Sequence, residues 1–277
     1  MPTTTARKAK PKPDTPTVHT SITGQRTELG SLLAQRLAQQ GLRETAPARV
    51  HFNLAGQQAN TLLHDGHAWK DFARAAREGA RRAMRAEADL LVHASFAFVA
   101  PPPPKDPLRS LAQVIEEIEQ LVQAGARPAC VLRLGYQYGP TSRDLLAYRT
   151  AFKLGRPYWA GSRKAGQFHL HHDDAVSALL AAATLKNAGK TCYATSGPPL
   201  PFMNFMDDFA RRLGKRVILH APRLAAPMFK LVVCTEHMQQ VDLAMAEGAA
   251  SPPLPGWQPN WPDHRAALDQ IVTGWKA

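Results

Sequence analysis

The first 135 residues of this chain lack tyrosine: of the five tyrosines in 277 residues, Tyr136 is the first. This absence excludes a tyrosine proton donor from that stretch. Cysteine is also scarce, since Cys130, Cys192 and Cys234 are the only three. Their odd number, wide spacing and apolar surroundings predict buried, reduced thiols instead of a disulfide framework. We therefore expect a reducing compartment, with the cytoplasm as the default location.

Long hydrophobic runs are missing as well. The longest, such as 224–234, are too short to cross a bilayer, and the N-terminus has no apolar signal-peptide core. We therefore expect no membrane span. Positive charge, in contrast, is abundant, with a net charge of +12 and a pI of about 10.0. This excess favours an anionic partner such as nucleic acid, a membrane surface or a phosphorylated ligand.

Strand-like and helical patterns alternate along the chain. Such alternation is typical of a parallel sheet with helical crossovers, so we predict an α/β fold with a Rossmann-like doubly wound sheet. We divide the chain into a flexible basic tail (1–16), a Rossmann-like domain (17–165) and a C-terminal portion (166–277) that includes a small α/β lobe. Strands are expected over 18–23, 49–55, 90–99, 129–134, 168–170 and 191–194, and helices over 29–40, 68–85, 108–123 and 202–213.

Three segments carry a family resemblance. Residues 23–30 read TGQRTELG, residues 131–140 read VLRLGYQYGP, and residues 168–178 read FHLHHDDAVSA. In this order they resemble the TGxxGxxG turn, the LRPxxxYGP segment and the FVHVDDVAxA run of the extended short-chain dehydrogenase/reductase group, the NAD-dependent epimerase/dehydratase-like proteins. The resemblance, to a divergent member, implies that NAD or NADP is the cofactor. The cofactor-binding residues that it implies are Gly24, Thr27, Gly30 and Ser95.

The cofactor turn departs from the family pattern at one position. Thr27 stands where the turn has its middle glycine, and it fills space through which the backbone approaches a diphosphate. Gly24 and Gly30 are retained, so we expect the turn and the contact between helix and strand to survive.

A second departure lies just after the first helix. Residues 49–56, RVHFNLAG, resemble the family's later VxHLAA strand, and this spacing implies that a strand and a helix are missing. The missing piece would carry the residue that reads the adenosine ribose. If this strand is instead the second one, no Asp or Glu stands at its end. Either way, we expect a sheet truncated in its N-terminal half and a poorly specified adenosine pocket.

Proton transfer in this family uses a Tyr and a Lys four residues later, which share one helix face. The helix expected over 108–123 occupies the matching place and contains neither residue. Ser95 stands close to the family's serine, but without the tyrosine it would at most orient a ligand. Tyr136 and Tyr138 are the remaining catalytic candidates, because they could face a ligand crevice at a strand end, although packing explains them equally well. Usual dehydrogenase catalysis is therefore not expected.

Two clusters of polar residues favour structural interpretations. Glu116, Glu117 and Glu119 could be replacement acids, but we expect them to be solvated on the outer face of their helix. The cluster of His169, His171, His172, Asp173 and Asp174 could hold a metal. We favour a junction between a strand and a helix, where a carboxylate satisfies free amides, and we predict no metal site.

The leading hypothesis is an atypical protein of this fold that has lost the Tyr/Lys pair and binds a small-molecule or dinucleotide ligand, or interacts with a partner. One alternative is an active NAD(P)-dependent oxidoreductase or epimerase with a relocated acid such as Tyr136 or Tyr138. The other is a basic scaffold that binds nucleic acid. Its candidate contacts are Arg74, Arg77, Arg81, Arg82, Arg85, Arg211, Arg212, Lys215 and Arg216.

Overall fold

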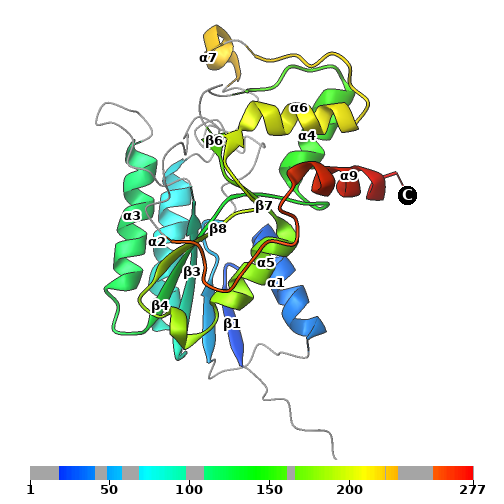
Figure 1. Ribbon diagram of the computed structural model, residues 1–277. Helices are drawn as coiled ribbons and strands as arrows, with labels where there is room; N and C mark the ends of the chain where they lie inside the picture. Colours follow the sequence, from blue (N-terminus) through cyan, green and yellow to red (C-terminus); the bar gives the residue numbers. More distant parts are fainter. Residues whose placement is uncertain are drawn as a thin grey trace, which may run out of the picture.

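The structure is a computed structural model of the chain. It describes residues 19–40, 49–57, 69–97, 109–160, 166–221, 223–229 and 252–276. A sheet flanked by helices forms one part of the molecule, and a smaller lobe lies against the end of the sheet (Figure 1). The expectations for the tail 1–16, for Cys234 and for residues 18, 68, 98–99 and 108 lie outside the described residues.

The central sheet has five strands in the order β1-β2-β3-β4-β8, and every pairing in it is parallel. Helices α1 and α5 cover one face, and α2 and α3 cover the other. This arrangement confirms the predicted α/β, Rossmann-like fold. The elements are β1 (Thr20–Thr23), α1 (Glu28–Gln39), β2 (Val50–Asn53), α2 (Trp69–Arg85), β3 (Leu90–Phe96), α3 (Arg109–Gln123), β4 (Ala129–Leu134), α5 (His172–Ala182) and β8 (Thr191–Ala194).

Burial explains why the apolar runs become strands. All seven residues of β3 are buried, as expected for a parallel strand that helices cover on both faces. Cys130 and Cys192 are buried free thiols in this core, in agreement with the prediction. Burial raises the pKa of the Cys130 thiol to about 12, so this thiol stays protonated.

Strand order shows where the sheet departs from a full dinucleotide fold. In the order 3-2-1-4-5-6, the first strand lies between the second and the fourth. Here β1 pairs with β2, and β2 pairs with β3, so β2 takes the place of the fourth strand. The described residues add no strand on the far side of β1. This agrees with the expected truncation and with the resemblance of residues 49–56 to a later strand.

The handedness of two crossover connections is consistent with the same truncation. Those through α1 and α2 each advance one strand in the same direction, but the two helices lie on opposite faces of the sheet. The two crossovers therefore have opposite hands, although nearly all such units are right-handed. In the full order, α1 would lead to a strand on the far side of β1. The described residues place no strand on that side, and α1 is followed by β2 instead.

The smaller lobe has a core of its own, rich in aromatic side chains. Tyr148 and Phe152 of α4 pack with Phe205 and Phe209 of α6 and with Ile271 of α9. Sequence patterns did not predict α4, and it packs with later helices, so the boundary at 165/166 stays a prediction. The elements here are β5 (Tyr136–Tyr138), α4 (Arg143–Lys153), β6 (Gly166–Gln167), β7 (His169–His171), β9 (Leu200–Pro201), α6 (Phe202–Arg212), α7 (Ala226–Phe229) and α9 (His264–Gly274).

Short strand pairs and single helical turns complete the described structure. β5 pairs with β7 in parallel, β6 pairs with β9 in antiparallel fashion, and single turns of 3-10 helix lie at Leu185–Asn187 and Arg223–Ala225. Among the described helices, none combines the length and the hydrophobicity that a membrane span needs.

Candidate functional site

The turn between β1 and α1 has the tight geometry that its retained glycines predict. Gly24 has a φ of 87°, and a Cβ added there would lie 2.6 Å from the carbonyl carbon of Leu54. A Cβ added at Gly30 would collide with the backbone oxygen of Gly24. Both positions therefore require glycine, and the turn holds the start of α1 close to the ends of β1 and β2.

Thr27 uses the space of the missing glycine to cap its own helix. Its Oγ1 accepts a hydrogen bond of 3.0 Å from the Gly30 amide and donates one of 2.7 Å to the Gly24 carbonyl. A phosphate at a helix N-terminus binds free amides of this first turn. One of those amides is already satisfied here, and the side chain stands between the helix and an approaching diphosphate.

Glu28 places a carboxylate at the same helix end. Burial raises its pKa from 4.5 to about 7, and hydrogen bonds from Thr141 and the Arg143 backbone only partly offset this. Its Oε1 lies 4.0 Å from Nε2 of His172 and has no hydrogen-bond partner in the described part of the chain. A partly ionised acid at this position repels an anionic ligand. Sequence reasoning missed Glu28, although an acid inside the motif was a visible signal.

Two glutamines close the carboxyl end of the sheet above β3. Gln57 donates a hydrogen bond of 3.0 Å to the Ala94 carbonyl and accepts one of 2.6 Å from Nε2 of Gln137. Both side chains are buried, and they come from segments 80 residues apart. Ligands of open α/β sheets bind outside this carboxyl edge. The Gln57–Gln137 bridge therefore occupies part of the crevice with the chain's own side chains.

Ser95 belongs to a buried ion pair. Its hydroxyl donates to Oε1 of Glu119, and Arg133 holds the same carboxylate with contacts of 3.0 Å and 2.6 Å. The expectation that Glu119 is solvated was therefore wrong, because its side chain is only 8% exposed. Glu117 is half-exposed and pairs with Arg77 at 2.7 Å. A hollow of about 10 Å³ remains beside Ser95, which is room for about one water molecule.

Tyr136 and Tyr138 lie in the aromatic core between the sheet and the lobe. The Tyr136 hydroxyl donates a hydrogen bond of 3.0 Å to Asp144, and burial and this acid hold its pKa well above 10. Burial also raises the pKa of Tyr138, which packs edge-on against Phe205. Neither side chain is more than 3% exposed. Their catalytic role stays a prediction, and their burial opposes proton exchange with a ligand.

The junction between β7 and α5 is structural. His171 Nδ1 accepts a hydrogen bond of 3.3 Å from the Asp173 amide, while His169 stacks on Phe205. Asp174 is fully buried, and it accepts hydrogen bonds from the backbone amides of Asn260 and Trp261 at 2.7 Å and 3.0 Å. The carboxylate thus ties down the segment before α9, where we had expected it to satisfy amides of its own helix. Among the described residues, no group of three acidic, His or Cys side chains is arranged to hold a metal.

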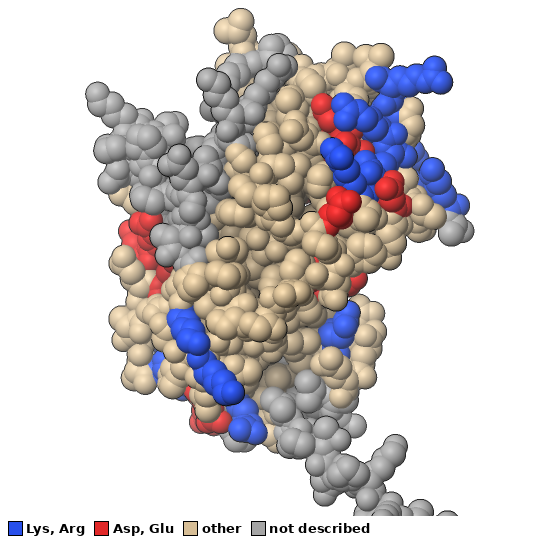
Figure 2. Space-filling model, in the orientation of Figure 1, with Lys and Arg blue, Asp and Glu red and all other residues tan. Residues whose placement is uncertain are grey.

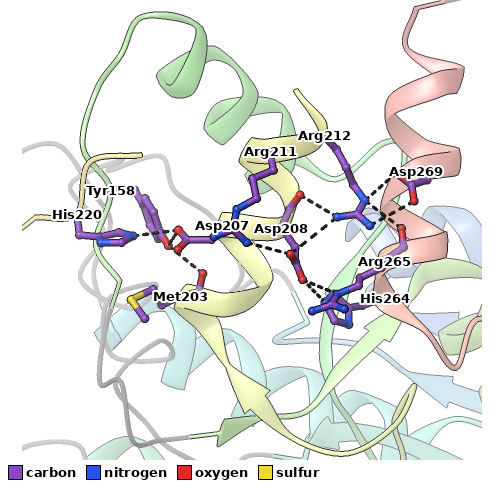
Figure 3. Close-up of polar contacts among 10 residues, drawn as sticks. All are labelled: Tyr158, Met203, Asp207, Asp208, Arg211, Arg212, His220, His264, Arg265 and Asp269. Carbon is purple, nitrogen blue, oxygen red and sulfur yellow. Dashed lines mark hydrogen bonds and ion pairs between the residues drawn. The ribbon is translucent and has the colours of Figure 1, made fainter. Parts of the chain in front are cut away.

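A second polar cluster joins α6 to its neighbours in the lobe (Figure 3). Asp208 accepts hydrogen bonds from His264 and Arg265 of α9 at 3.0 Å and 2.9 Å. Although burial opposes ionisation, these bonds hold the pKa of Asp208 below its usual value. On the other side of α6, Asp207 accepts hydrogen bonds of 2.9 Å from both Tyr158 and His220.

Much of the lobe's positive charge is paired in this way. Arg211 contacts Asp208 at 3.3 Å, and Arg212 contacts Asp269 at 2.8 Å. Figure 2 shows acidic residues among the Lys and Arg side chains over this end of the molecule. Two of the four cations expected to contact nucleic acid here therefore have protein carboxylates as partners.

Comparison with known proteins gives a match in fold but none in sequence. No family model matches the chain, and no curated protein matches it. The human epimerase family protein SDR39U1, solved with NADPH, superposes with a TM-score of 0.70 at 16% identity, over 92% of this chain and 99% of that one.

Two microbial structures extend the match. UDP-N-acetylglucosamine 4-epimerase from Methanobrevibacter ruminantium has a TM-score of 0.63 at 11% identity, over 93% of this chain and 98% of that one. RMD from Pseudomonas aeruginosa, complexed with NADPH, has a TM-score of 0.62 at 16% identity, over 94% and 98%. At these identities the likeness shows the fold: the chain has the fold of the NAD-dependent epimerase and dehydratase proteins, as its three motifs predicted.

The described residues do not fit a dinucleotide in the way that this fold usually holds one. On the adenosine side the described residues form no strand beyond β1, the first turn of α1 follows Thr27 and contains Glu28, and the Gln57–Gln137 bridge lies at the carboxyl edge of the sheet. Each feature acts on a different part of the cofactor, so the misfit extends along its length.

Proposed function

We propose that this chain is a non-catalytic protein built on the epimerase/dehydratase fold, which binds a ligand or a partner and transfers neither hydride nor proton. The observation that carries the proposal is the ion pair of Glu119 with Arg133, together with Ser95. The helix that would supply the Tyr/Lys pair supplies a buried carboxylate instead, and this carboxylate binds the serine hydroxyl. The proton-transfer site has thereby become part of the core.

NAD or NADP is the first ligand class to test, because two of the matched structures carry NADPH. We expect weak binding at most. A diphosphate would have to displace the Thr27 cap and approach Glu28, and each of these costs free energy that the usual glycine turn does not. The nicotinamide side would also have to break the hydrogen bond between Gln57 and Gln137.

Calorimetric titration with NAD, NADH, NADP and NADPH, each at pH 7.5, tests the ligand. Absorbance at 340 nm tests net hydride transfer, and chromatography of nucleotide sugars after incubation tests epimerisation and dehydration, in which the cofactor is regenerated. The proposal predicts neither a change in absorbance nor a new sugar product above a protein-free control, whether or not a dinucleotide binds. Heat from one of the four would identify the ligand as a dinucleotide, whereas no heat from any would direct the search to other ligands.

Turnover would contradict the proposal, and two variants then locate the acid. Loss of turnover in Tyr136→Phe or Tyr138→Phe would establish the alternative of an active enzyme with a relocated tyrosine. Tyr193→Phe serves as the matched control, because it removes the same hydroxyl from a tyrosine that stacks on Phe168 and is not a catalytic candidate.

A further inference from the structure

A hollow of about 610 Å³ lies at the opposite end of the sheet from the crevice. It opens between the amino ends of β3 and β4 and the last turns of α2 and α3. Leu91 and Val122 form its buried floor, while Met84 and Leu185 line its sides. Its size falls within the range of small-molecule sites in proteins.

One basic side chain, that of Arg127, is among the described residues that line the hollow. Its NH1 nitrogen is buried without a hydrogen-bond partner in the part of the chain that the structure describes. The acid on the rim, Asp89, is 66% exposed and lies 3.8 Å from Nε of Arg49. A buried guanidinium nitrogen that lacks an acceptor is costly, and such groups in native proteins commonly mark a bound water or ion that satisfies them.

We propose that this hollow is a binding site for an organic carboxylate with an apolar body. The carboxylate would accept hydrogen bonds from Arg127, and the apolar body would lie on Met84, Leu91 and Val122. A guanidinium fork matches the two oxygens of a carboxylate. A phosphate dianion would need further donors, and Arg127 is the only basic residue among the described residues that line the hollow.

The orientation of the ligand follows from the neighbouring helices. The carboxyl ends of α2 and α3 border the hollow, and the partial negative charge of a helix end disfavours an anion beside it. The charged group must therefore lie at the guanidinium of Arg127, whose positive charge opposes that of the helix ends. The apolar body is then left to contact Met84 and Val122 in their last turns. The site is independent of the proposed function, because none of its residues belongs to the crevice.

Octanoate and 1-octanol make a matched pair of probes, since they share one apolar chain and differ in charge. Calorimetry with the full chain should show octanoate binding, and 1-octanol should bind at least tenfold more weakly. Arg127→Gln should weaken octanoate at least tenfold and leave 1-octanol unchanged. The control variant Arg156→Gln removes one exposed positive charge from the smaller lobe. It should bind octanoate with the affinity of the wild type.

Two further variants separate binding from folding. Ala88→Phe places a ring in the hollow, and it should abolish octanoate binding with little change in melting temperature, since residue 88 follows the end of α2. Arg127→Met should leave the ligand-free protein as stable as the wild type or more so, because it removes an unpaired buried donor. Equal octanoate affinity in Arg127→Gln and the wild type, or undiminished affinity in Ala88→Phe, would overturn the proposal.

Discussion

The Ser95 hydroxyl donates a hydrogen bond of 2.5 Å to Oε1 of Glu119, across the interface between β3 and α3. Arg133 of β4 holds the other carboxylate oxygen at 2.6 Å, so three neighbouring elements share one buried charge pair. Glu119 and Arg133 are 8% and 13% exposed. At this depth an ion pair is costly to break, because the remaining partner keeps its charge without compensation.

Glu119→Gln should therefore destabilise the protein by roughly 3 kcal/mol, since Arg133 is left as an unpaired buried cation. Urea unfolding at pH 7 measures the loss. The matched control is Glu117→Gln, which breaks a half-exposed pair with Arg77 and should cost at most about 0.5 kcal/mol. In the double variant Glu119→Leu with Arg133→Met, most of the loss should be recovered. A Glu119→Gln protein as stable as the control would show that the pair contributes little.

The burial of Glu119 could have been predicted from the sequence. It follows Ile115 by four residues and precedes Val122 by three, so it shares their buried helix stripe. Arg133 was the second signal. It is the one charged residue of the buried strand β4, and a buried cation needs a carboxylate partner. The prediction failed because it treated all three glutamates of the helix as one outer face.

Local sequence patterns predicted some of the remaining features of the fold and could not predict others. Apolar runs predicted the five strands of the sheet, with β4 and β8 correct to the residue. The side of β1 on which β2 pairs depends on tertiary packing, which periodicity does not encode. The same holds for the contact between Gln57 and Gln137, because it joins segments far apart in the chain. Helix α4, in contrast, could have been predicted, because Leu145, Tyr148 and Phe152 recur at helical spacing after the N-cap residue Ser142.

Glu28 should make stability depend on pH in a defined direction. Its pKa is about 7 in the folded state against an ordinary value of 4.5, so folding favours the protonated acid. Stability is therefore lost as the pH rises from about 4.5 through 7, and it stays lost above. Glu28→Gln removes this penalty. It should stabilise the protein by roughly 2 kcal/mol at pH 8 and by only about 0.5 kcal/mol at pH 5.

The same substitution tests the electrostatic barrier at α1. With one negative charge removed from the helix N-terminus, the affinity for NADH at pH 8 should rise by roughly fivefold. Glu78→Gln on the exposed side of α2 is the control, and it should change neither property. An unfolding free energy for Glu28→Gln that parallels the wild type from pH 5 to pH 8 would contradict the raised pKa.

Buried histidines should destabilise the fold in acid. Burial lowers the pKa to about 4 for His51 and His93, and to about 3 for His169 and His172. The unfolded chain takes up these protons near pH 6.5, before the folded chain does. Each histidine therefore removes up to roughly 1.4 kcal/mol of stability per pH unit below 6.5. Urea unfolding at pH 7.5, 6 and 5 should show a steep loss.

A single substitution tests whether buried histidines cause this dependence of the unfolding free energy on pH. His169 stacks on Phe205 with 4.3 Å between ring centroids, so a phenyl ring suits its place. His169→Phe should reduce the dependence on pH by about one proton and leave stability at pH 7.5 nearly unchanged. If the slope of the variant equals that of the wild type, His169 does not carry the acid sensitivity.

Asp174 should control the attachment of the segment that leads into α9. Its two oxygens accept hydrogen bonds from the backbone amides of Asn260 and Trp261 and from the Asn260 side chain. Asp174→Ala leaves these donors unsatisfied, so it should cost roughly 2 to 3 kcal/mol. Asp173→Ala is the matched control, since the neighbouring Asp173 is 56% exposed and makes long contacts of 3.9 Å and 3.7 Å with Arg36 and His171. Hydrogen exchange should accelerate at Asn260 and Trp261 in the first variant and stay at the wild-type rate in the second. Exchange that is equally slow in both would mean that other contacts hold the segment.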